Sequence, residues 1–585
     1  MPIRRLLLSL CLLCGFSSAS ASADAAFNKA FGDDWFAQYW QYNPDFAVSV
    51  GYYPVAGQLA VPTATNRKTY LRWLDAQLKR LGGFNAADLS PAARSDLAML
   101  KTQLEVERWS LTTLKNWQWN PSAYNVAEPI ALLLSIPYAP EPARLRSVQQ
   151  RLLKVPAYYA AAKQAISKPT REHTQLAIQQ NNGALEVLGA SLEKQVAGSA
   201  LTATERTQFL AALKSARAAV NDYLDWLRAL DAQLAKDGTA RSFRLGEALY
   251  EQKFAYDIQS GSTGKALYQR ALQEKEHLHA RMAVLSDQLW PQYFAEQKPP
   301  SDRMQKIAML IAQLSERHIT REGFVEEVKR QIPLLEAFVR EKNLLTQDAT
   351  RPLQVRETPE YQRGFSIASI NAPGPYDATA NTYYNVSPLD EYTSEQAESF
   401  LREYNHWQLQ VLNIHEAVPG HYVQLIDANK SSSRIKAVFG NGAMVEGWAV
   451  YSEKMMLEAG WGGHEPEMEL IHGKWLLRVT TNTILDYGIH VLNWDEQKVL
   501  DLIRNEAFQN ETEARGKWRR ATLSQVQLTS YFAGYSAIYD YRERLKKQLG
   551  DRFDLKQFHE QFLSYGSAPV VVIESLMKPE DVAKP

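Results

Sequence analysis

The run His415-Glu-Ala-Val-Pro-Gly-His421 places two imidazoles and a carboxylate within seven residues, at the end of an apolar helical pattern. Imidazole nitrogens and carboxylate oxygens are zinc ligands, and a catalytic zinc keeps one coordination position open for water. In the motif His-Glu-x-x-His the two histidines share one helical face and the glutamate serves as the base. The run therefore predicts a metal site, with zinc as the ion and water activation as its chemistry.

The spacing of six between the two histidines requires a break in the helix. On an ideal helix, six residues turn through about 600° and rise about 9 Å, which leaves the two imidazoles about 120° apart. Pro419 has no N–H and cannot bond back to His415, and Gly420 accepts backbone angles that other residues resist. We therefore expect an irregularity over residues 418–420 that returns His421 to the side of His415. The alternative is a kinked core helix whose histidines bond to their neighbours.

The ten residues from His415 to Gln424, His-Glu-Ala-Val-Pro-Gly-His-Tyr-Val-Gln, resemble the signature of a large bacterial family known as domain of unknown function 885. The resemblance runs from about residue 30 to the C-terminus and is strongest from residue 360 onward. The family is regarded as zinc metallopeptidases, by inference more than by demonstration. It is distantly similar to angiotensin-converting enzyme-like and Taq-type carboxypeptidases, so the resemblance implies a two-lobed helical fold with a deep cleft.

The composition is that of an ordinary globular protein, with 45% hydrophobic and 22% charged residues among 585. This length is enough for one large core or two lobes. The formal net charge is zero, without a broad basic excess, which argues against a nucleic-acid partner. After residue 23, no segment reaches the roughly 20 apolar residues of a membrane span.

Residues 1–23 have the pattern of a secretory signal peptide. Two arginines precede an apolar run from Leu6 to Phe16, and Ala21-Ser22-Ala23 supplies a small-residue cleavage site. Removing this segment takes away two of the 65 basic residues and none of the 65 acidic ones, which gives a formal charge of −2. We expect secretion across the inner membrane, into the periplasm.

Both cysteines, Cys11 and Cys14, lie within the predicted signal peptide. Neither is preceded by the small residue that a lipid-attachment box needs. We therefore expect a mature chain that begins near Asp24 and has neither thiol nor disulfide, although it works in an oxidising compartment.

From Phe27 to about Gln297, apolar residues recur at helical spacing. Pro156 predicts a kink or a split in one of these helices. Lys298-Pro-Pro-Ser301 then predicts the passage from an N-terminal helical lobe, residues 24–300, to a C-terminal catalytic lobe, residues 301–585, although 24–585 also fits one family domain. The clearest N-terminal helices are predicted at Tyr70–Leu81, Ser95–Leu111, Val148–Ile166 and Arg206–Leu234.

Past helical patterns at Met304–Leu314 and Arg321–Leu345, the period changes. Phe365–Ile370 and Thr382–Val386 predict two strands around a Pro/Gly loop. We expect a small β-hairpin that either pairs with an extended peptide at its free edge or is purely structural. Thr393 and Gln396 then form a capping box, and the helix that follows is predicted to continue into His415.

A third ligand is predicted from Glu446-Gly-Trp-Ala-Val-Tyr-Ser-Glu453, because two histidines at a zinc site usually need one more protein ligand. The two glutamates lie two helical turns apart on one face, so both cannot readily bind one ion. The resemblance favours Glu446, in the matching Glu-Gly-Trp-Ala run. Glu453 is then expected to orient a ligand histidine. Further candidates for supporting the ligands or binding substrate are Gln424, Tyr384, Asp486, Tyr535 and Arg542.

Two downstream elements complete the predicted site. Asp486 and His490 are four residues apart, so the carboxylate can fix the tautomer of the histidine. The resemblance implies that His490 faces the site as a transition-state donor, and the alternative is a satisfied helix pair.

The segment from Gln527 to Tyr535 resembles the family element Gln-x-x-x-Tyr-x-x-Gly, although Gln525-Val526 stands where the family has Pro-Gly. Tyr531 or Tyr535 is implied as a hydrogen-bond donor to the oxyanion. Arg542 is either structural or holds a substrate carboxylate.

Together these patterns predict a mainly α, two-lobed metallopeptidase-like fold that hydrolyses peptide bonds in short peptides, as an oligopeptidase, dipeptidase or carboxypeptidase. One Zn²⁺ is held by His415, His421 and Glu446, Glu416 is the base, and His490 and Tyr531 stabilise the oxyanion. One alternative is a zinc amidohydrolase that acts on a non-protein amide such as a cell-wall fragment. The other is a non-catalytic peptide- or metal-binding protein, against which the intact Glu416 argues.

Overall fold

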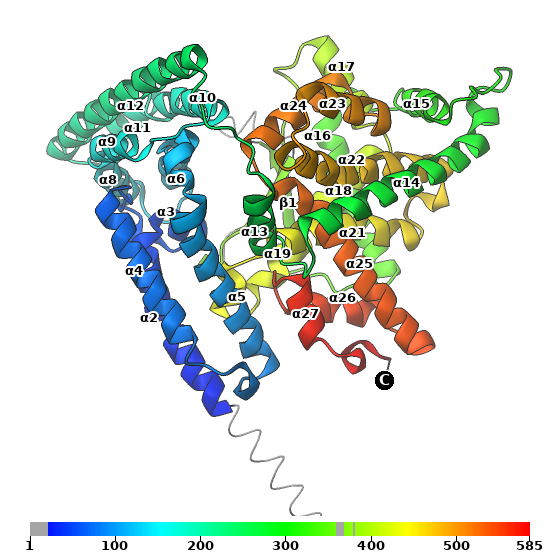
Figure 1. Cartoon of the computed structure of the whole chain (residues 1–585), viewed down its shortest axis with the longest axis horizontal. Helices are drawn as coiled ribbons and strands as arrows, with labels where there is room; N and C mark the ends of the chain where they lie inside the picture. The colour runs from blue at the N-terminus through cyan, green and yellow to red at the C-terminus, as the bar shows by residue number, and fades with distance from the viewer. Residues whose placement is uncertain (1–20, 359–367, 378–380, 585) are drawn as a thin grey trace, which may run out of the picture. The chain divides into compact units, whose positions relative to one another are not determined.

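The computed structural model describes residues 21–358, 368–377 and 381–584 (Figure 1). Helices account for 72% of the structure and strands for 3%, which confirms the predicted mainly α fold with a small sheet. Most of the predicted signal peptide lies outside the described residues, and residues 21–30 are helical. Among the described residues, no helix combines the length and the apolar composition that a membrane crossing would require.

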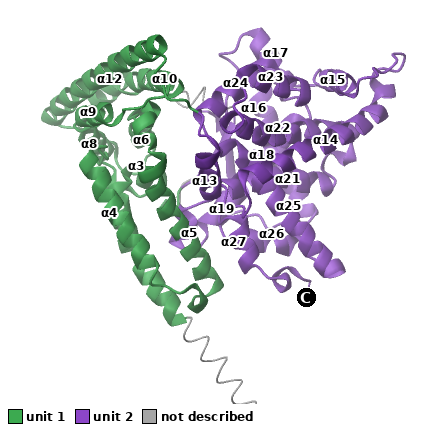
Figure 2. Cartoon of the chain, viewed as in Figure 1, with its two compact units in different colours: residues 1–243, 374–378 green, residues 244–373, 379–585 purple. Residues whose placement is uncertain are grey.

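The chain forms two compact units (Figure 2). Unit 1 consists of Met1–Phe243 and Gly374–Ala378, and unit 2 of Arg244–Pro373 and Thr379–Pro585. The sequence placed the passage between lobes at residues 298–301, but this segment joins α14 (Gly264–Tyr293) to α15 (Arg303–Leu314), which pack against each other inside unit 2. The Pro-Pro pair therefore marks a turn between two helices of one unit.

In unit 1 the four predicted helices are present, and the third is split as expected. The split falls just before Pro156, which lies in the first turn of α9, where a missing N–H costs little. Helix α4 packs against α5, and α10 against α12. The helices of this unit are α2 (Asp33–Tyr42), α3 (Pro44–Ser49), α4 (Ala64–Leu81), α5 (Pro91–Trp109), α6 (Asn116–Trp119), α7 (Ala127–Ser135), α8 (Glu141–Leu152), α9 (Val155–Ala165), α10 (Arg171–Val187), α11 (Ala190–Gly198) and α12 (Ala203–Asp237).

Unit 2 is organised around α22 (Pro466–His490), whose residues are buried on nearly every side. A helix buried all round belongs in the core of a unit, and α14 packs along this one. The other helices of unit 2 are α13 (Glu247–Asp257), α16 (Phe324–Glu341), α17 (Ser394–Glu403), α18 (Gln408–Glu416), α19 (His421–Asn429), α20 (Arg434–Val438), α21 (Gly442–Glu458), α23 (Glu496–Asp501), α24 (Glu511–Leu523), α25 (Ser530–Leu549), α26 (Leu555–Ser564) and α27 (Val570–Leu576).

Helices α21 and α25 cross at a pair of glycines. A Cβ built on Gly447 would lie 2.4 Å from the Cα of Gly534, and one on Gly534 would lie 1.7 Å from the carbonyl oxygen of Ala443. Only glycine leaves room for two helix backbones at this separation. The crossing gives the two glycines of the sequence motifs a packing role. It also sets Glu446 on α21 close to Tyr531, which precedes Gly534 by about one turn of α25.

The β structure is a three-stranded sheet in the order β1-β3-β2, formed by β1 (Leu353–Glu357), β2 (Ala368–Asn371) and β3 (Thr382–Val386). Strand β3 has the predicted bounds. The predicted first strand, Phe365–Ile370, begins outside the described residues and overlaps β2. Strands β2 and β3 pair antiparallel, as the expected hairpin requires. A third strand, β1, pairs with β3 in parallel and was not predicted. This strand comes from a segment that the sequence left without a prediction.

Candidate metal centre

The helix that carries His415 is shorter than predicted. The capping box of Thr393 and Gln396 is present, but α17 ends at Glu403 and a separate helix, α18, begins at Gln408. Between them the side-chain oxygen of Asn405 accepts hydrogen bonds from the backbone N–H groups of Trp407 and Gln408, both at 3.1 Å. Because this side chain satisfies N–H groups at the start of α18, the chain restarts a helix here instead of continuing one.

The expected irregularity between the two histidines is present. Helix α18 ends at Glu416 and α19 begins at His421, and the backbone N–H of Gly420 donates to the carbonyl of Ile414 at 3.0 Å. A Cβ on Gly420 would lie 1.9 Å from the carbonyl oxygen of His415. Since φ of Gly420 is −75°, space rather than a left-handed conformation explains the glycine. The indole N–H of Trp448 donates to the carbonyl of Pro419 at 2.9 Å and fixes the bend.

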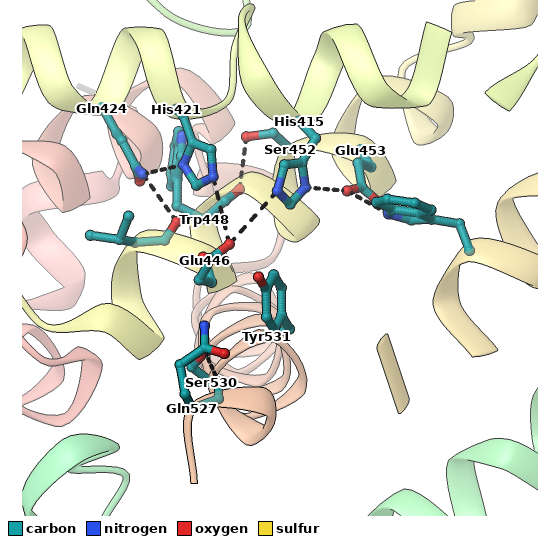
Figure 3. A network of polar contacts seen from close by, with 12 residues as sticks. His415, His421, Gln424, Glu446, Trp448, Ser452, Glu453, Gln527, Ser530 and Tyr531 are labelled. Atoms are coloured by element: carbon teal, nitrogen blue, oxygen red, sulfur yellow. Dashed lines mark hydrogen bonds and ion pairs between the residues drawn. The ribbon is translucent and has the colours of Figure 1, made fainter. Parts of the chain in front are cut away.

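The bend brings His421 beside His415, and Glu446 of α21 faces both (Figure 3). The Oε2 atom of Glu446 lies 3.7 Å from Nε2 of His415 and 3.6 Å from Nε2 of His421. Ligand atoms at about 2.0–2.2 Å from one zinc lie about 3.4 Å apart in a tetrahedral arrangement. The three side chains therefore fit a zinc site with one position left open. Within the described residues, no other group of three potential ligand residues converges in this way.

Two of the predicted supporting side chains contact the ligand histidines. Glu453 is fully buried, and its Oε1 atom lies 2.6 Å from Nδ1 of His415. Because the ionised carboxylate can only accept, Nδ1 carries the proton and Nε2 is left as the ligand nitrogen. The side-chain nitrogen of Gln424 lies 2.9 Å from Nδ1 of His421 and donates to the carbonyl of Val445 at 3.0 Å.

Two further residues that contact Glu453 were not predicted from the sequence. The indole N–H of Trp475 donates to Oε1 of Glu453 at 2.9 Å, and Nε2 of His472 lies 3.4 Å from Oε2. Both come from α22, one turn apart. Their spacing of three is shared by many helical pairs, so only a view of α22 against α21 identifies them.

Burial and charge shift the pKa values of the cluster in opposite directions. Burial alone would lower the pKa of His415, but hydrogen bonds to Glu446 and Glu453 raise it well above its ordinary value. Burial alone would raise the pKa of Glu446, but His415 and His421 lower it. Burial raises the pKa of Glu416, against the opposing charges of the two histidines. A carboxyl group with a raised pKa is a better proton acceptor, as a general base requires.

Tyr531 is the predicted tyrosine that faces the cluster. Figure 3 shows its hydroxyl directed toward Glu446 and His415. The guanidinium of Arg520 donates to this hydroxyl at 3.2 Å. Tyr535, one turn further along α25, packs its ring against Tyr539 at 5.9 Å.

The position of His490 does not fit the expected transition-state donor. Its side chain is fully buried, and Nε2 lies 2.9 Å from the carbonyl oxygen of Ala521 and 3.2 Å from that of Ser524. A ring nitrogen so close to two carbonyl oxygens carries the proton and donates to them. This histidine therefore secures the end of α24, and a side chain without exposed surface does not reach a substrate.

Asp486 also has a role that the sequence did not predict. Its Oδ1 atom accepts hydrogen bonds from the hydroxyl of Tyr250 at 2.8 Å and from the backbone N–H of Val526 at 3.0 Å. Val526 has φ of +69°, which is unfavourable for a β-branched residue. Asp486 therefore holds a backbone turn that glycine would adopt freely.

Two other candidates are structural. Arg542 is 4% exposed, and its guanidinium lies 2.8 Å from carboxylate oxygens of both Glu458 and Glu543. Its charge is therefore already paired, which favours the structural alternative. Tyr384 is fully buried, and its hydroxyl donates to the side chain of Asn413 on α18 at 2.9 Å. It supports the helix that carries His415.

Comparison with known sequences and structures places this chain in a wider group. The sequence profile of a family described as "Bacterial protein of unknown function (DUF885)" matches residues 44–577. No curated protein matches the chain. A solved structure described as a "putative lipoprotein of unknown function" from Shewanella oneidensis is 51% identical, with a TM-score of 0.87 over 95% of this chain and 99% of that one. A "putative lipoprotein" from Colwellia psychrerythraea is 16% identical and shares the fold, with a TM-score of 0.75 over 95% and 98% of the two chains.

Proposed function

The chain belongs to the bacterial family DUF885, and we propose that it is a zinc-dependent hydrolase of peptide bonds in short peptides. The observation that carries this proposal is that His415, His421 and Glu446 each place one potential ligand atom within 4.8 Å of the other two. Glu416 follows His415 directly in the sequence. Three nitrogen and oxygen ligands with an open position are typical of catalytic zinc, whereas structural zinc sites are closed by four.

The donor set fits zinc, and His415, His421 and Glu446 would hold it. Bound zinc supplies a Lewis acid that lowers the pKa of water and polarises the scissile carbonyl. Glu453 keeps the proton of His415 on Nδ1, away from the ligand nitrogen. Gln424 restrains the ring of His421 through its Nδ1 side.

Glu416 acts as the general base and then as the general acid. It takes a proton from the attacking water as the water oxygen bonds to the carbonyl carbon. When the C–N bond breaks, the same carboxyl group gives that proton to the leaving amine. Tyr531 donates a hydrogen bond to the oxyanion that forms in between, a role that its direction in Figure 3 supports.

We also propose that the protein acts outside the cytoplasm, in the cell envelope, with the periplasm as the compartment. The signal-peptide pattern of residues 1–23 supports this. The two similar structures described as those of putative lipoproteins agree with it.

The test begins with purified mature protein in three states: as purified, after chelation, and after zinc has been returned. Metal content and cleavage of a peptide library are measured for each state. We expect one zinc per chain and chelator-sensitive cleavage. Glu416→Gln keeps the size of the side chain and removes the base. Zinc content should stay near wild type, while hydrolysis falls by a factor of about 10²–10⁴.

Glu296→Gln, at an exposed position in a loop, is the matched control and should leave both zinc content and hydrolysis unchanged. Full turnover in Glu416→Gln would contradict the mechanism even with zinc bound. Cleavage of cell-wall amides without cleavage of any peptide would replace the peptidase with the amidohydrolase.

A further inference from the structure

A second group of charged side chains lies next to the metal centre and is not used by the mechanism above. It consists of Arg478 of α22 with Lys517 and Arg520 of α24, and we call these three residues the basic cluster. Glu513, Lys517 and Arg520 follow a spacing of four and three, which places them on one face of α24. Glu513 lies 3.1 Å from the guanidinium of Arg478. Within the basic cluster, Glu513 therefore pairs directly with Arg478 only.

Lys517 is the unusual member of the basic cluster. Its side chain is 6% exposed, and its ammonium has neither a hydrogen bond nor an ion pair with any residue that the structure describes. Burial, together with the charges of Arg478 and Arg520, holds its pKa well below the ordinary value of lysine. Keeping this side chain charged without a partner would lower stability, so its low pKa favours the neutral amine in the ligand-free protein. An anion from outside the chain would pair with the ammonium and favour its charged form.

Two chains of contacts connect the basic cluster to the metal centre. In the first, Arg520 donates to the hydroxyl of Tyr531 at 3.2 Å, and this hydroxyl is directed toward Glu446 (Figure 3). In the second, the guanidinium of Arg478 lies 5.2 Å from the ring of Trp475, whose indole N–H donates to Glu453 at 2.9 Å. The excess positive charge is therefore adjacent to the place where the scissile bond would lie.

We propose that the basic cluster binds the free α-carboxylate of a peptide substrate, with Lys517 as its central cation. This rests on the proposed peptidase function and narrows it to a carboxypeptidase or dipeptidase, which releases the C-terminal residue. An α-carboxylate is present on every unblocked peptide, whereas only some substrates carry an acidic side chain. A buried amino group at a fixed position, charged when an anion lies beside it, therefore suits the α-carboxylate better. The cationic N-terminal amine would be repelled from the same place.

Binding to the chelator-treated protein tests the subsite without hydrolysis. The probes for calorimetric titration are N-acetyl-phenylalanine, its C-terminal amide, N-acetyl-aspartic acid α-amide and inorganic phosphate. We expect the free acid to bind about 10–100-fold more tightly than its amide, the range given by a charge-assisted hydrogen bond. Equal affinity for acid and amide, or no binding of either, overturns the proposal. Tighter binding of the aspartic acid derivative or of phosphate overturns the assignment to the α-carboxylate.

Lys517→Met removes the charge and keeps an unbranched side chain of similar length. It should abolish the preference for the acid, Lys517→Arg should retain part of it, and Lys546→Met, at an exposed position of α25, should retain all of it. A preference unchanged in Lys517→Met overturns the role of this lysine.

The stability of ligand-free protein gives a second readout that a structural lysine would not give. Because the ammonium has no partner in the described structure, Lys517→Met should raise the melting temperature, and N-acetyl-phenylalanine should raise it for wild type but not for the variant. A lower melting temperature for Lys517→Met would show that the lysine stabilises the fold and would overturn the proposal. The two proposals can fail separately. If the protein never takes up zinc but still prefers the acid to the amide, and loses this preference in Lys517→Met, the peptidase function is wrong and the carboxylate subsite is confirmed.

Discussion

Glu107 in unit 1 and Glu446 in unit 2 are both enclosed among hydrogen-bonding partners, and the pKa values of the two carboxyl groups shift in opposite directions. In unit 1, Glu107 of α5 accepts hydrogen bonds from the hydroxyls of Tyr39, at 2.6 Å, and Tyr70, and from the amide of Gln103 at 2.6 Å. Burial raises the pKa of this carboxyl to about 7, although the bond from Tyr39 acts in the other direction. In unit 2, Glu446 is also largely enclosed, but its two histidines lower its pKa.

For these two carboxyl groups, the type of hydrogen-bonding partner decides whether the enclosed carboxylate stays charged. Neutral hydroxyl and amide donors compensate only part of the lost hydration, whereas an imidazolium supplies a full opposite charge. A metal cation would supply a still larger one. Glu446 is thus kept as an anion in a place where a cation can bind, and Glu107 is kept as a group that readily takes up a proton.

Among variants that test this comparison, Glu446→Gln is expected to have the largest effect on zinc content and hydrolysis. The variant keeps the shape of the side chain and removes the charge that the ligand set needs, so zinc and hydrolysis should be lost together. Metal analysis after dialysis and a peptide assay on the same sample measure both. Glu107→Gln is the matched control from unit 1, and it should keep one zinc per chain. If Glu446→Gln held zinc as well as wild type, Glu446 would have to be removed from the ligand set.

A smaller loss of zinc affinity is expected at Glu453, which contacts His415 and is not one of the three proposed zinc ligands. Glu453→Gln replaces an acceptor of the Nδ1 proton with a neutral amide, so zinc affinity should fall by about 10–100-fold, the usual effect of losing such a partner. Competition with a chromophoric chelator measures the affinity. A loss of zinc as complete as that of Glu446→Gln would make Glu453 a ligand, and an unchanged affinity would show that the imidazole needs no partner there.

Local patterns in the sequence were sufficient for much of the fold and for the ligand cluster. The helical period located α4, α5 and α12, Pro156 marked the split between α8 and α9, and the spacing of His415 and His421 required the bend that the structure shows. Each of these depends on residues a few positions apart.

What the sequence did not predict depends on partners far away in the chain. Strand β1 forms only because β3 pairs with it across 29 positions. The restart of the helix at Gln408 depends on how one asparagine side chain is oriented. His490 lies on a helix that is buried all round, so its position in the chain could not show that it faces the carbonyls of Ala521 and Ser524. Lys517 looks like any lysine of an amphipathic helix until the helix is packed.

The smallest expected effect is on the pH dependence of the free energy of unfolding, and it comes from Glu107→Gln. Its pKa in the folded state, about 7, lies above the value of about 4.3 in an unfolded chain, so the folded state binds the proton more tightly. The stabilisation from this proton is complete below about pH 4 and is lost as pH rises toward 7, by at most about 1.4 kcal/mol per pH unit. Glu107→Gln carries its own N–H and no charge, so its free energy of unfolding should fall less than that of wild type between pH 4.5 and 7.

Urea denaturation at several pH values in this range measures the effect, with the signal taken from the tryptophans near Tyr39 in unit 1. Glu105→Gln, on the same helix at a partly exposed position beside Lys101, is the control and should follow the wild-type pH dependence. If Glu107→Gln had the same pH dependence as wild type, the carboxyl of Glu107 would already be ionised at pH 4.5. The hydroxyl groups of unit 1 would then stabilise a buried anion as well as the imidazoles of unit 2 do, and partner type would no longer distinguish the two sites.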